Sequence, residues 1–152
     1  MALTNSLSKI CVLVIKTHSF KRSRRISVSK IVNRMTKKVL LVDDNVDAAD
    51  TLEMLLGMDG FQVTTVYDGV TALAAAGDIS PDVVVMDIGM PGMDGYDAAR
   101  MMRQLPGGED MVLIALTGWG QPADKSRASE AGFNHHLIKP VDYDTLLKCV
   151  RA

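Results

Sequence analysis

Short apolar segments alternate with longer amphipathic segments from residue 39 to the end of the chain. The apolar segments are brief and almost without polar residues, as expected for strands buried in a parallel sheet. We predict strands at residues 39–42, 61–66, 82–86, 111–116 and 134–138. Each is followed by a helix, so strand and helix alternate five times. This order favours an α/β fold in which short right-handed crossovers place helices on both faces of the sheet.

Local signals set the helix boundaries. Asn45 is a suitable cap for the first helix, whose apolar face we expect to begin at Val46. Asp68 begins the next helix and Gly77 is expected to end it. Further helices are predicted at residues 96–105, 122–131 and 142–150.

Residues 1–36 differ in composition from the rest of the chain. Residues 1–38 contain ten Lys or Arg and no Asp or Glu, whereas residues 39–152 contain the other seven basic residues and all 18 acidic ones. We predict a basic, disordered leader at 1–36 and one domain at 37–152. Met35 begins a run that reads like a natural start, so the leader is alternatively an artefact of start-codon assignment. No run approaches the roughly 18 apolar residues that span a bilayer, and we expect a cytoplasmic protein without membrane contact.

Polar residues stand where four of the apolar segments stop. Asp43 and Asp44 follow the first, Asp87 the third, Thr117 the fourth and Lys139 the fifth. The carboxyl ends of parallel strands lie along one edge of a sheet, so these side chains are expected to share one pocket. Crowded carboxylates repel unless a cation lies among them. The pattern therefore indicates a divalent metal site, with Mg²⁺ as the favoured ion, and a nucleophilic aspartate.

Each of these residues also has a purely structural interpretation. An Asp pair before a helix is often a cap, a threonine is common at a strand end, and a lone lysine is usually a solvated charge. The occurrence of all these residues at strand ends favours the metal site over the separate structural interpretations. The loop after Asp87 is rich in glycine, and Gly89 is the best candidate for a backbone carbonyl ligand. Lys139 precedes Pro140, which restricts its backbone and aims its side chain.

Residues 38–151 resemble the receiver domain of response regulators in bacterial two-component systems, the CheY-like family. The resemblance rests on the Asp43-Asp44 pair, the Met-Pro-Gly-Met-Asp-Gly loop after Asp87, Thr117 and Lys139-Pro140. The runs around Thr117 and Lys139 are similar to receivers attached to hybrid histidine kinases. The family implies a flavodoxin-like (βα)5 fold with strand order 2-1-3-4-5.

The resemblance also implies chemistry. Asp87 would accept a phosphoryl group from a sensor histidine kinase or a histidine phosphotransfer protein. Asp44, Asp87 and the Gly89 carbonyl would bind Mg²⁺, with Asp43 acting through water, while Thr117 and Lys139 would hold the phosphoryl oxygens. The domain would contribute to its own dephosphorylation, so it is a signalling domain rather than an enzyme.

One position departs from the family pattern. Receivers often carry Tyr or Phe three residues before the lysine as a switch residue, and here His136 stands there beside His135. His136 is either a histidine that swings inward with Thr117 and adds pH sensitivity, or simply a polar residue on an edge strand. Trp119 either shields the phosphorylated aspartate or packs on its loop.

We therefore expect a stand-alone protein that is switched by phosphorylation. Phosphorylation would repack the surface formed by the fourth helix, the fifth strand and the fifth helix. The chain would be a monomer, or a weak homodimer that associates through this surface. The alternatives are a phosphate relay, an unphosphorylated scaffold and, less favoured, a DNA-bound regulator using the basic leader. A haloacid-dehalogenase-like phosphatase is discounted because Gly89 replaces the second carboxylate that such enzymes need.

Overall fold

The computed structural model describes residues 36–118, 120 and 122–152. The predicted leader, apart from Thr36, and the predicted role of Trp119 lie outside these residues. The boundary between leader and domain stays a prediction. None of the described helices is long and apolar enough to cross a membrane.

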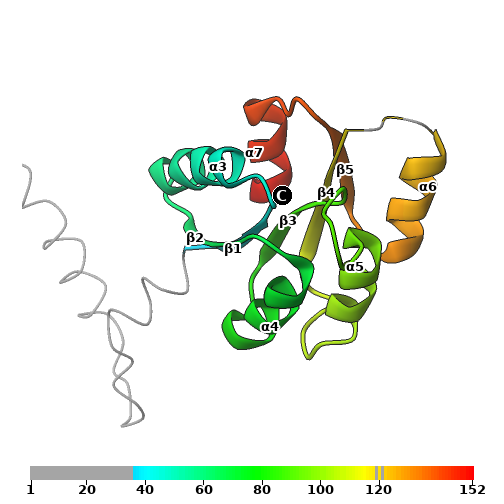
Figure 1. The fold of residues 1–152 in the computed structure, drawn as a ribbon. Helices are drawn as coiled ribbons and strands as arrows, with labels where there is room; N and C mark the ends of the chain where they lie inside the picture. The colour runs from blue at the N-terminus through cyan, green and yellow to red at the C-terminus, as the bar shows by residue number, and fades with distance from the viewer. Residues whose placement is uncertain (1–35, 119, 121) are drawn as a thin grey trace, which may run out of the picture. The chain divides into compact units, whose positions relative to one another are not determined.

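Five parallel strands form a single sheet in the order β2-β1-β3-β4-β5 (Figure 1). Their bounds are β1 Lys38–Val42, β2 Gln62–Val66, β3 Val83–Asp87, β4 Val112–Thr117 and β5 His135–Ile138. The predicted flavodoxin-like order is confirmed. β3 continues one residue further than predicted, so Asp87 is part of the strand and its backbone is fixed by pairing with Leu116 of β4.

A helix follows each strand. The helices are α3 Val46–Met58, α4 Gly69–Ile79, α5 Gly95–Arg103, α6 Pro122–Ala131 and α7 Tyr143–Arg151. Four of them begin after a side chain that accepts a hydrogen bond from the first turn, as N-caps do; these are Asn45, Asp68, Asp94 and Asp142. The cap predicted at Asn45 is confirmed, and Asp68, which was predicted to begin the next helix, is the N-cap of α4.

The helices cover both faces of the sheet, which gives two apolar layers (Figure 1). On one face α3 and α7 pack against residues such as Leu41 and Ile114. On the other, α4, α5 and α6 pack against residues such as Leu40 and Ala115. The three central strands are almost completely buried, which explains why their sequences are nearly continuous apolar runs.

Two local predictions are wrong. Gly77 does not end α4, which continues to Ile79. The residue that caps the helix is Ser80, whose backbone is in the left-handed region with φ of 48°. A glycine inside a helix costs only about 1 kcal/mol relative to alanine, so the neighbouring alanines carry the helix through it. Val46 was expected on the buried face of α3 but is 49% exposed. It is the first residue of the helix, next to the exposed Asn45 and Asp47.

Candidate functional site

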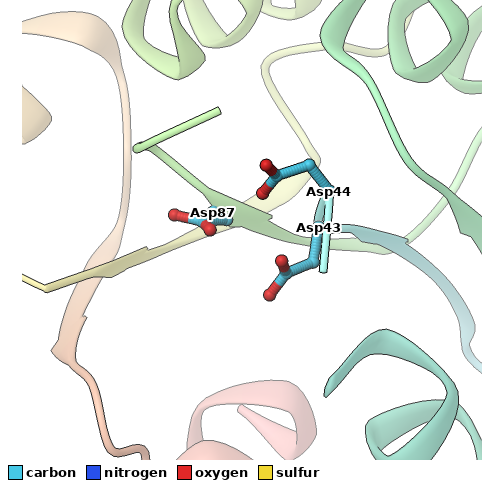
Figure 2. Close-up of side chains that lie close together, drawn as sticks. All are labelled: Asp43, Asp44 and Asp87. Carbon is cyan, nitrogen blue, oxygen red and sulfur yellow. The ribbon is translucent and has the colours of Figure 1, made fainter. Parts of the chain in front are cut away.

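Three carboxylates meet at the carboxyl edge of the sheet. Asp43 and Asp44 follow β1, and Asp87 ends β3, the strand that pairs directly with β1. One oxygen from each carboxylate can be chosen so that all three lie within 4.8 Å of one another. Figure 2 shows the three side chains projecting from these two strand ends into the same region. The structure thus brings together the acidic residues that the sequence singled out.

The backbone orients two of these carboxylates. Asp43 is only 1% exposed, and its Oδ1 accepts a hydrogen bond from the Asn45 N–H at 2.9 Å. Asp87 is 8% exposed, and its Oδ1 accepts one from the Gly89 N–H at 2.8 Å. Buried carboxylates are stable only when they are paired and hydrogen-bonded, which these contacts provide in part. Asp44 is exposed.

Lys139 supplies the one cation at the cluster in the described part of the chain. Its Nζ donates to Asp87 Oδ2 at 2.8 Å and to Asp43 Oδ2 at 3.1 Å. Burial by itself would lower the pKa of Lys139, but the hydrogen bonds and charges of Asp87 and Asp43 outweigh it, so the pKa is raised. Lys139 is therefore an ammonium at neutral pH. One ammonium beside three carboxylates leaves an excess of negative charge and of oxygen donors, which suits a divalent cation.

The backbone fixes Lys139 as well. Its N–H donates to the Thr117 carbonyl at 2.7 Å, and its peptide bond to Pro140 is cis. Thr117 is the last residue of β4, is 5% exposed and pairs with Ile138 of β5. The polar residues that end β4 and follow β5 are therefore held side by side.

A hollow of about 400 Å³ opens beside this edge of the sheet. Gly89 and other residues of the loop after β3 line one wall, and Thr117 and Gly118 line another. The loop is tightly folded, because a Cβ added at Gly95 would lie 2.8 Å from the Ile88 Cα. The hollow gives an incoming group access to the side of the site where Gly89 and Thr117 lie.

Arg127 and Tyr96 also line this hollow, and they were missed in the sequence. The Arg127 guanidinium carbon lies 4.6 Å from the centre of the Tyr96 ring, in a cation–π contact. The two residues come from α6 and α5. Neither stands at a strand end or in a motif, so the sequence held no signal for this pair.

His136 lies apart from the acidic cluster. It is on β5, opposite Ala115 of β4, and lines a second hollow between β5 and α6. Of the predicted site residues, the structure joins Asp43, Asp44, Asp87 and Lys139 directly and places Gly89 and Thr117 at the border of the site. His136 is connected to them only through the sheet.

Comparison with known proteins gives a family match over most of the chain. The family model described as "Response regulator receiver domain" matches residues 39–151. The receiver domain of the sensor histidine kinase PA1611 from Pseudomonas aeruginosa, solved with a magnesium ion in its active-site cleft, has a TM-score of 0.70. It is 33% identical, and the match covers 76% of this chain and 95% of that one. Chemotaxis response regulator CheY4 of Vibrio cholerae has a TM-score of 0.72 at 31% identity, covering 76% of this chain and 97% of that one.

Curated relatives differ in length. An uncharacterized 14.6 kDa protein encoded in the sodA1 3' region of Leptolyngbya boryana is 37% identical over 113 residues, 74% of this chain and 86% of the relative. The response regulator PleD of Caulobacter vibrioides is 33% identical over 118 residues, 78% of this chain, but only 26% of PleD is covered. The DNA-binding regulator RpaA of Synechocystis is 30% identical over 76% of this chain, with 48% of RpaA covered. The chain thus spans about half or less of these two larger regulators.

Proposed function

The chain belongs to the response regulator receiver domain family, and on this premise we propose that Asp87 accepts a phosphoryl group from a histidine kinase or a histidine phosphotransfer protein. The observation that carries the proposal is the position of the Lys139 ammonium, which bridges Asp87 and Asp43 beside the exposed Asp44. Such a site can neutralise the charge of a phosphoryl group that is being transferred.

Asp87 is favoured over the other two carboxylates as the acceptor. Asp43 is 1% exposed, against 8% for Asp87, and the residues next to Asp43 do not line the open hollow. Asp44 is exposed, and Lys139 bonds to Asp43 and Asp87 instead. Asp87 combines a Lys139 contact with a position just before Ile88 and Gly89, which both line the open hollow.

The donor set fits Mg²⁺, because it offers several carboxylate oxygens close together and no sulfur or imidazole. Asp44, Asp87 and the Gly89 carbonyl would hold the ion, with Asp43 acting through a water. When bound, Mg²⁺ would neutralise charge on the phosphoryl oxygens. That the related PA1611 receiver was solved with magnesium in its cleft supports this assignment.

The transfer itself needs little from the protein beyond positioning. An Asp87 oxygen attacks phosphorus, a new O–P bond forms and the P–N bond of phosphohistidine breaks. The imidazole keeps the electron pair and takes up a proton. Lys139 and the Thr117 hydroxyl would hold the phosphoryl oxygens during this exchange.

Removal of the phosphoryl group completes the cycle. Water attacks phosphorus, the O–P bond to Asp87 breaks, and inorganic phosphate leaves while the carboxylate is restored. Because the domain gains and loses a phosphoryl group only on its own Asp87, it would be a signalling domain rather than an enzyme. Passing the phosphoryl group to another histidine protein, or acting as an unphosphorylated scaffold, are the alternatives.

The signal would leave through protein contacts on the surface formed by α6, β5 and α7, where the chain acts as a monomer or a weak homodimer. Thr117 and His136 would transmit the change to this surface. We expect this to happen in the cytoplasm. RpaA carries DNA-binding in its name, so a DNA-bound role through the basic leader is the competing output. Salt-dependent retention on DNA that is lost when residues 1–34 are deleted would favour it.

Incubation with Mg²⁺ and acetyl phosphate, followed by intact mass measurement, tests the proposal. The wild-type chain should gain one phosphoryl group, and Asp87→Asn should gain none. Asp97→Asn is a matched control, because Asp97 is an exposed aspartate on α5 that pairs only with Arg100 among the described residues. An unmodified wild-type chain, or an Asp87→Asn chain modified to the same extent, would overturn the proposal.

A further inference from the structure

Arg127 supplies a cation to the hollow that opens beside the acidic cluster. Its guanidinium is the one positively charged group among the described residues that line this hollow. It takes part in no ion pair and donates no hydrogen bond within residues 36–118, 120 and 122–152. The contact with the Tyr96 ring, at 4.6 Å, uses no hydrogen-bond acceptor. The N–H groups of Arg127 are therefore available to an incoming molecule.

The fold holds this guanidinium in place through Tyr96. The Tyr96 ring is 5% exposed and meets Phe133 edge-on, with 6.4 Å between the ring centres. The Tyr96 N–H donates to the side chain of Asp94, which caps α5. Both the ring and the backbone of Tyr96 are therefore fixed, and the exposed Arg127 lies against a rigid surface. A cation that is positioned in this way loses less conformational freedom when it binds an anion.

Glycines keep the hollow open next to the site. Gly89 and Gly92 line it from the loop after β3, and Gly118 lines it directly after Thr117. A Cβ added at Gly89 would lie 3.5 Å from Asp87 Oδ1, so this part of the hollow adjoins the Asp87 carboxylate. The volume of about 400 Å³ is in the range of small-molecule sites. A small molecule in the hollow can therefore lie beside Asp87.

The other charged residues that line the hollow are acidic. Asp94 accepts a hydrogen bond as the cap of α5. Asp124 lies one helical turn before Arg127 and forms no ion pair with it in the described part of the chain. An anion in the hollow would be attracted by Arg127 and repelled by these carboxylates and by the acidic cluster. It would be held weakly, which suits a leaving group better than a resident ligand.

The chemistry of the leaving group decides whether this cation is useful. The imidazole of phosphohistidine departs as a neutral ring, which gains nothing from a neighbouring cation. With an acyl phosphate, an Asp87 oxygen attacks phosphorus, an O–P bond forms and the P–O bond to the acyl group breaks. The carboxylate leaves with the electron pair and needs no proton. Its two coplanar oxygens match a guanidinium, which binds carboxylates through paired hydrogen bonds.

We propose that Arg127 recognises the departing carboxylate of small acyl phosphates, and that this chain thereby favours such donors over donors whose leaving group is neutral. This inference rests on the proposed phosphorylation of Asp87. The guanidinium would stabilise the negative charge that develops on the leaving oxygen in the transition state. Arg127 would thus determine donor specificity from outside the acidic cluster.

The test compares two donors on the full chain with Mg²⁺, by intact mass measurement over time. Acetyl phosphate releases acetate, and phosphoimidazole, a small mimic of phosphohistidine, releases neutral imidazole. The ratio of the acetyl phosphate rate constant to the phosphoimidazole rate constant should fall about three- to tenfold in Arg127→Gln, as expected for one charge-assisted contact at an exposed position. Lys125→Gln removes an exposed charge from the same helix, at a residue that lines a different hollow, and should keep the wild-type ratio.

A second measurement separates an effect on the leaving group from an effect on the phosphoryl group or the fold. Beryllofluoride, an analogue of the phosphoryl group, carries no leaving group, so Arg127→Gln should bind it within about twofold of the wild type. An unchanged donor ratio in Arg127→Gln, an equal change in Lys125→Gln, or a parallel loss of beryllofluoride affinity would overturn the inference. A wild-type chain that reacts with neither donor and binds no beryllofluoride would overturn the proposed function, and this inference with it.

Discussion

Lys139 and Asp87 lie 52 residues apart in the chain, yet the Lys139 Nζ donates to Asp87 Oδ2 at 2.8 Å. The contact joins the residue after β5 to the last residue of β3, across β4. The same ammonium reaches Asp43, which directly follows β1, so one side chain links the ends of three strands. It is the main source of positive charge for a cluster that would otherwise be strongly repulsive.

Replacing Lys139 should therefore weaken both folding and the response to phosphorylation. In Lys139→Met, Asp43 and Asp87 lose their cation. We expect the free energy of unfolding to fall by about 1–2 kcal/mol, less than the 3–5 typical of fully buried pairs, because Lys139 remains partly exposed. Urea denaturation measures the change. Lys148→Met, at an exposed lysine of α7, should stay within about 0.5 kcal/mol of the wild type. Equal stability of the two variants would contradict the prediction.

Magnesium should stabilise the folded chain through the same carboxylates. A ligand at about 100 times its dissociation constant adds about 2.7 kcal/mol to the free energy of unfolding. The wild type should show this increase in urea denaturation, and Asp44→Asn should lose most of it. Because Asp44 is exposed and repelled by its neighbours, the substitution should leave metal-free stability unchanged or raise it by about 0.5 kcal/mol.

The control for the magnesium effect is Asp47→Asn, at an exposed aspartate of α3 that is not part of the cluster. It should respond to magnesium as the wild type does. If Asp44→Asn keeps the full response, the assignment of Asp44 as a ligand is wrong.

The strand ends were predictable because they carry two independent signals. Val39–Val42 and Val83–Met86 read as buried strands, and a carboxylate at each end has no place in an apolar layer. Parallel pairing then forces Asp43 and Asp87 together, since register fixes Val42 opposite Met86. The sheet order came from the family resemblance and not from these signals.

Other features had no sequence signal. Arg103 donates to the carbonyls of Gly108, Met111 and Gly132, which fastens the end of α5 to two loops. Nothing in the sequence distinguishes this arginine from Arg100, which forms an exposed pair with Asp97. Such contacts depend on where loops meet in space, which periodicity does not encode.

Gly95 should tolerate no side chain, because α5 begins against the loop that follows Asp87. A Cβ at this position would lie 2.8 Å from the Ile88 Cα and 3.1 Å from the Asp87 carbonyl oxygen. Gly95→Ala should lower the free energy of unfolding by about 1–3 kcal/mol, because the loop after Asp87 has to move. The same movement should weaken binding of beryllofluoride, an analogue of the phosphoryl group. Gly77→Ala is the matched control, since nothing lies within 4 Å of its added Cβ. In α4 it should raise stability by about 0.5–1 kcal/mol. If Gly95→Ala left both the free energy of unfolding and analogue binding unchanged, the prediction would be wrong, because the loop could then move without loss of stability.

Tyr143 should make the fold sensitive to alkali. Its hydroxyl donates to Asp59 Oδ2 at 2.6 Å, which links the start of α7 to the end of α3. Burial, together with the hydrogen bond and charge of Asp59, raises the pKa of Tyr143 to about 12. The unfolded chain ionises near the ordinary value of 10.0, so the contribution of this contact to stability is complete below about pH 10 and is lost as the pH rises toward 12.

Denaturation across this range, compared with Tyr143→Phe, isolates the effect. The wild type should be the more stable chain at about pH 9, and the difference between the two chains should shrink as the pH approaches the folded-state pKa of Tyr143. Ultraviolet titration should show three tyrosines ionising in the wild type and the loss of the most alkaline step in the variant. Tyr67→Phe serves as the control, because Tyr67 is an exposed tyrosine bonded to Asp50 at a longer 3.3 Å. A difference that stays constant from pH 9 to 12 would mean that the Asp59 contact does not hold the Tyr143 proton.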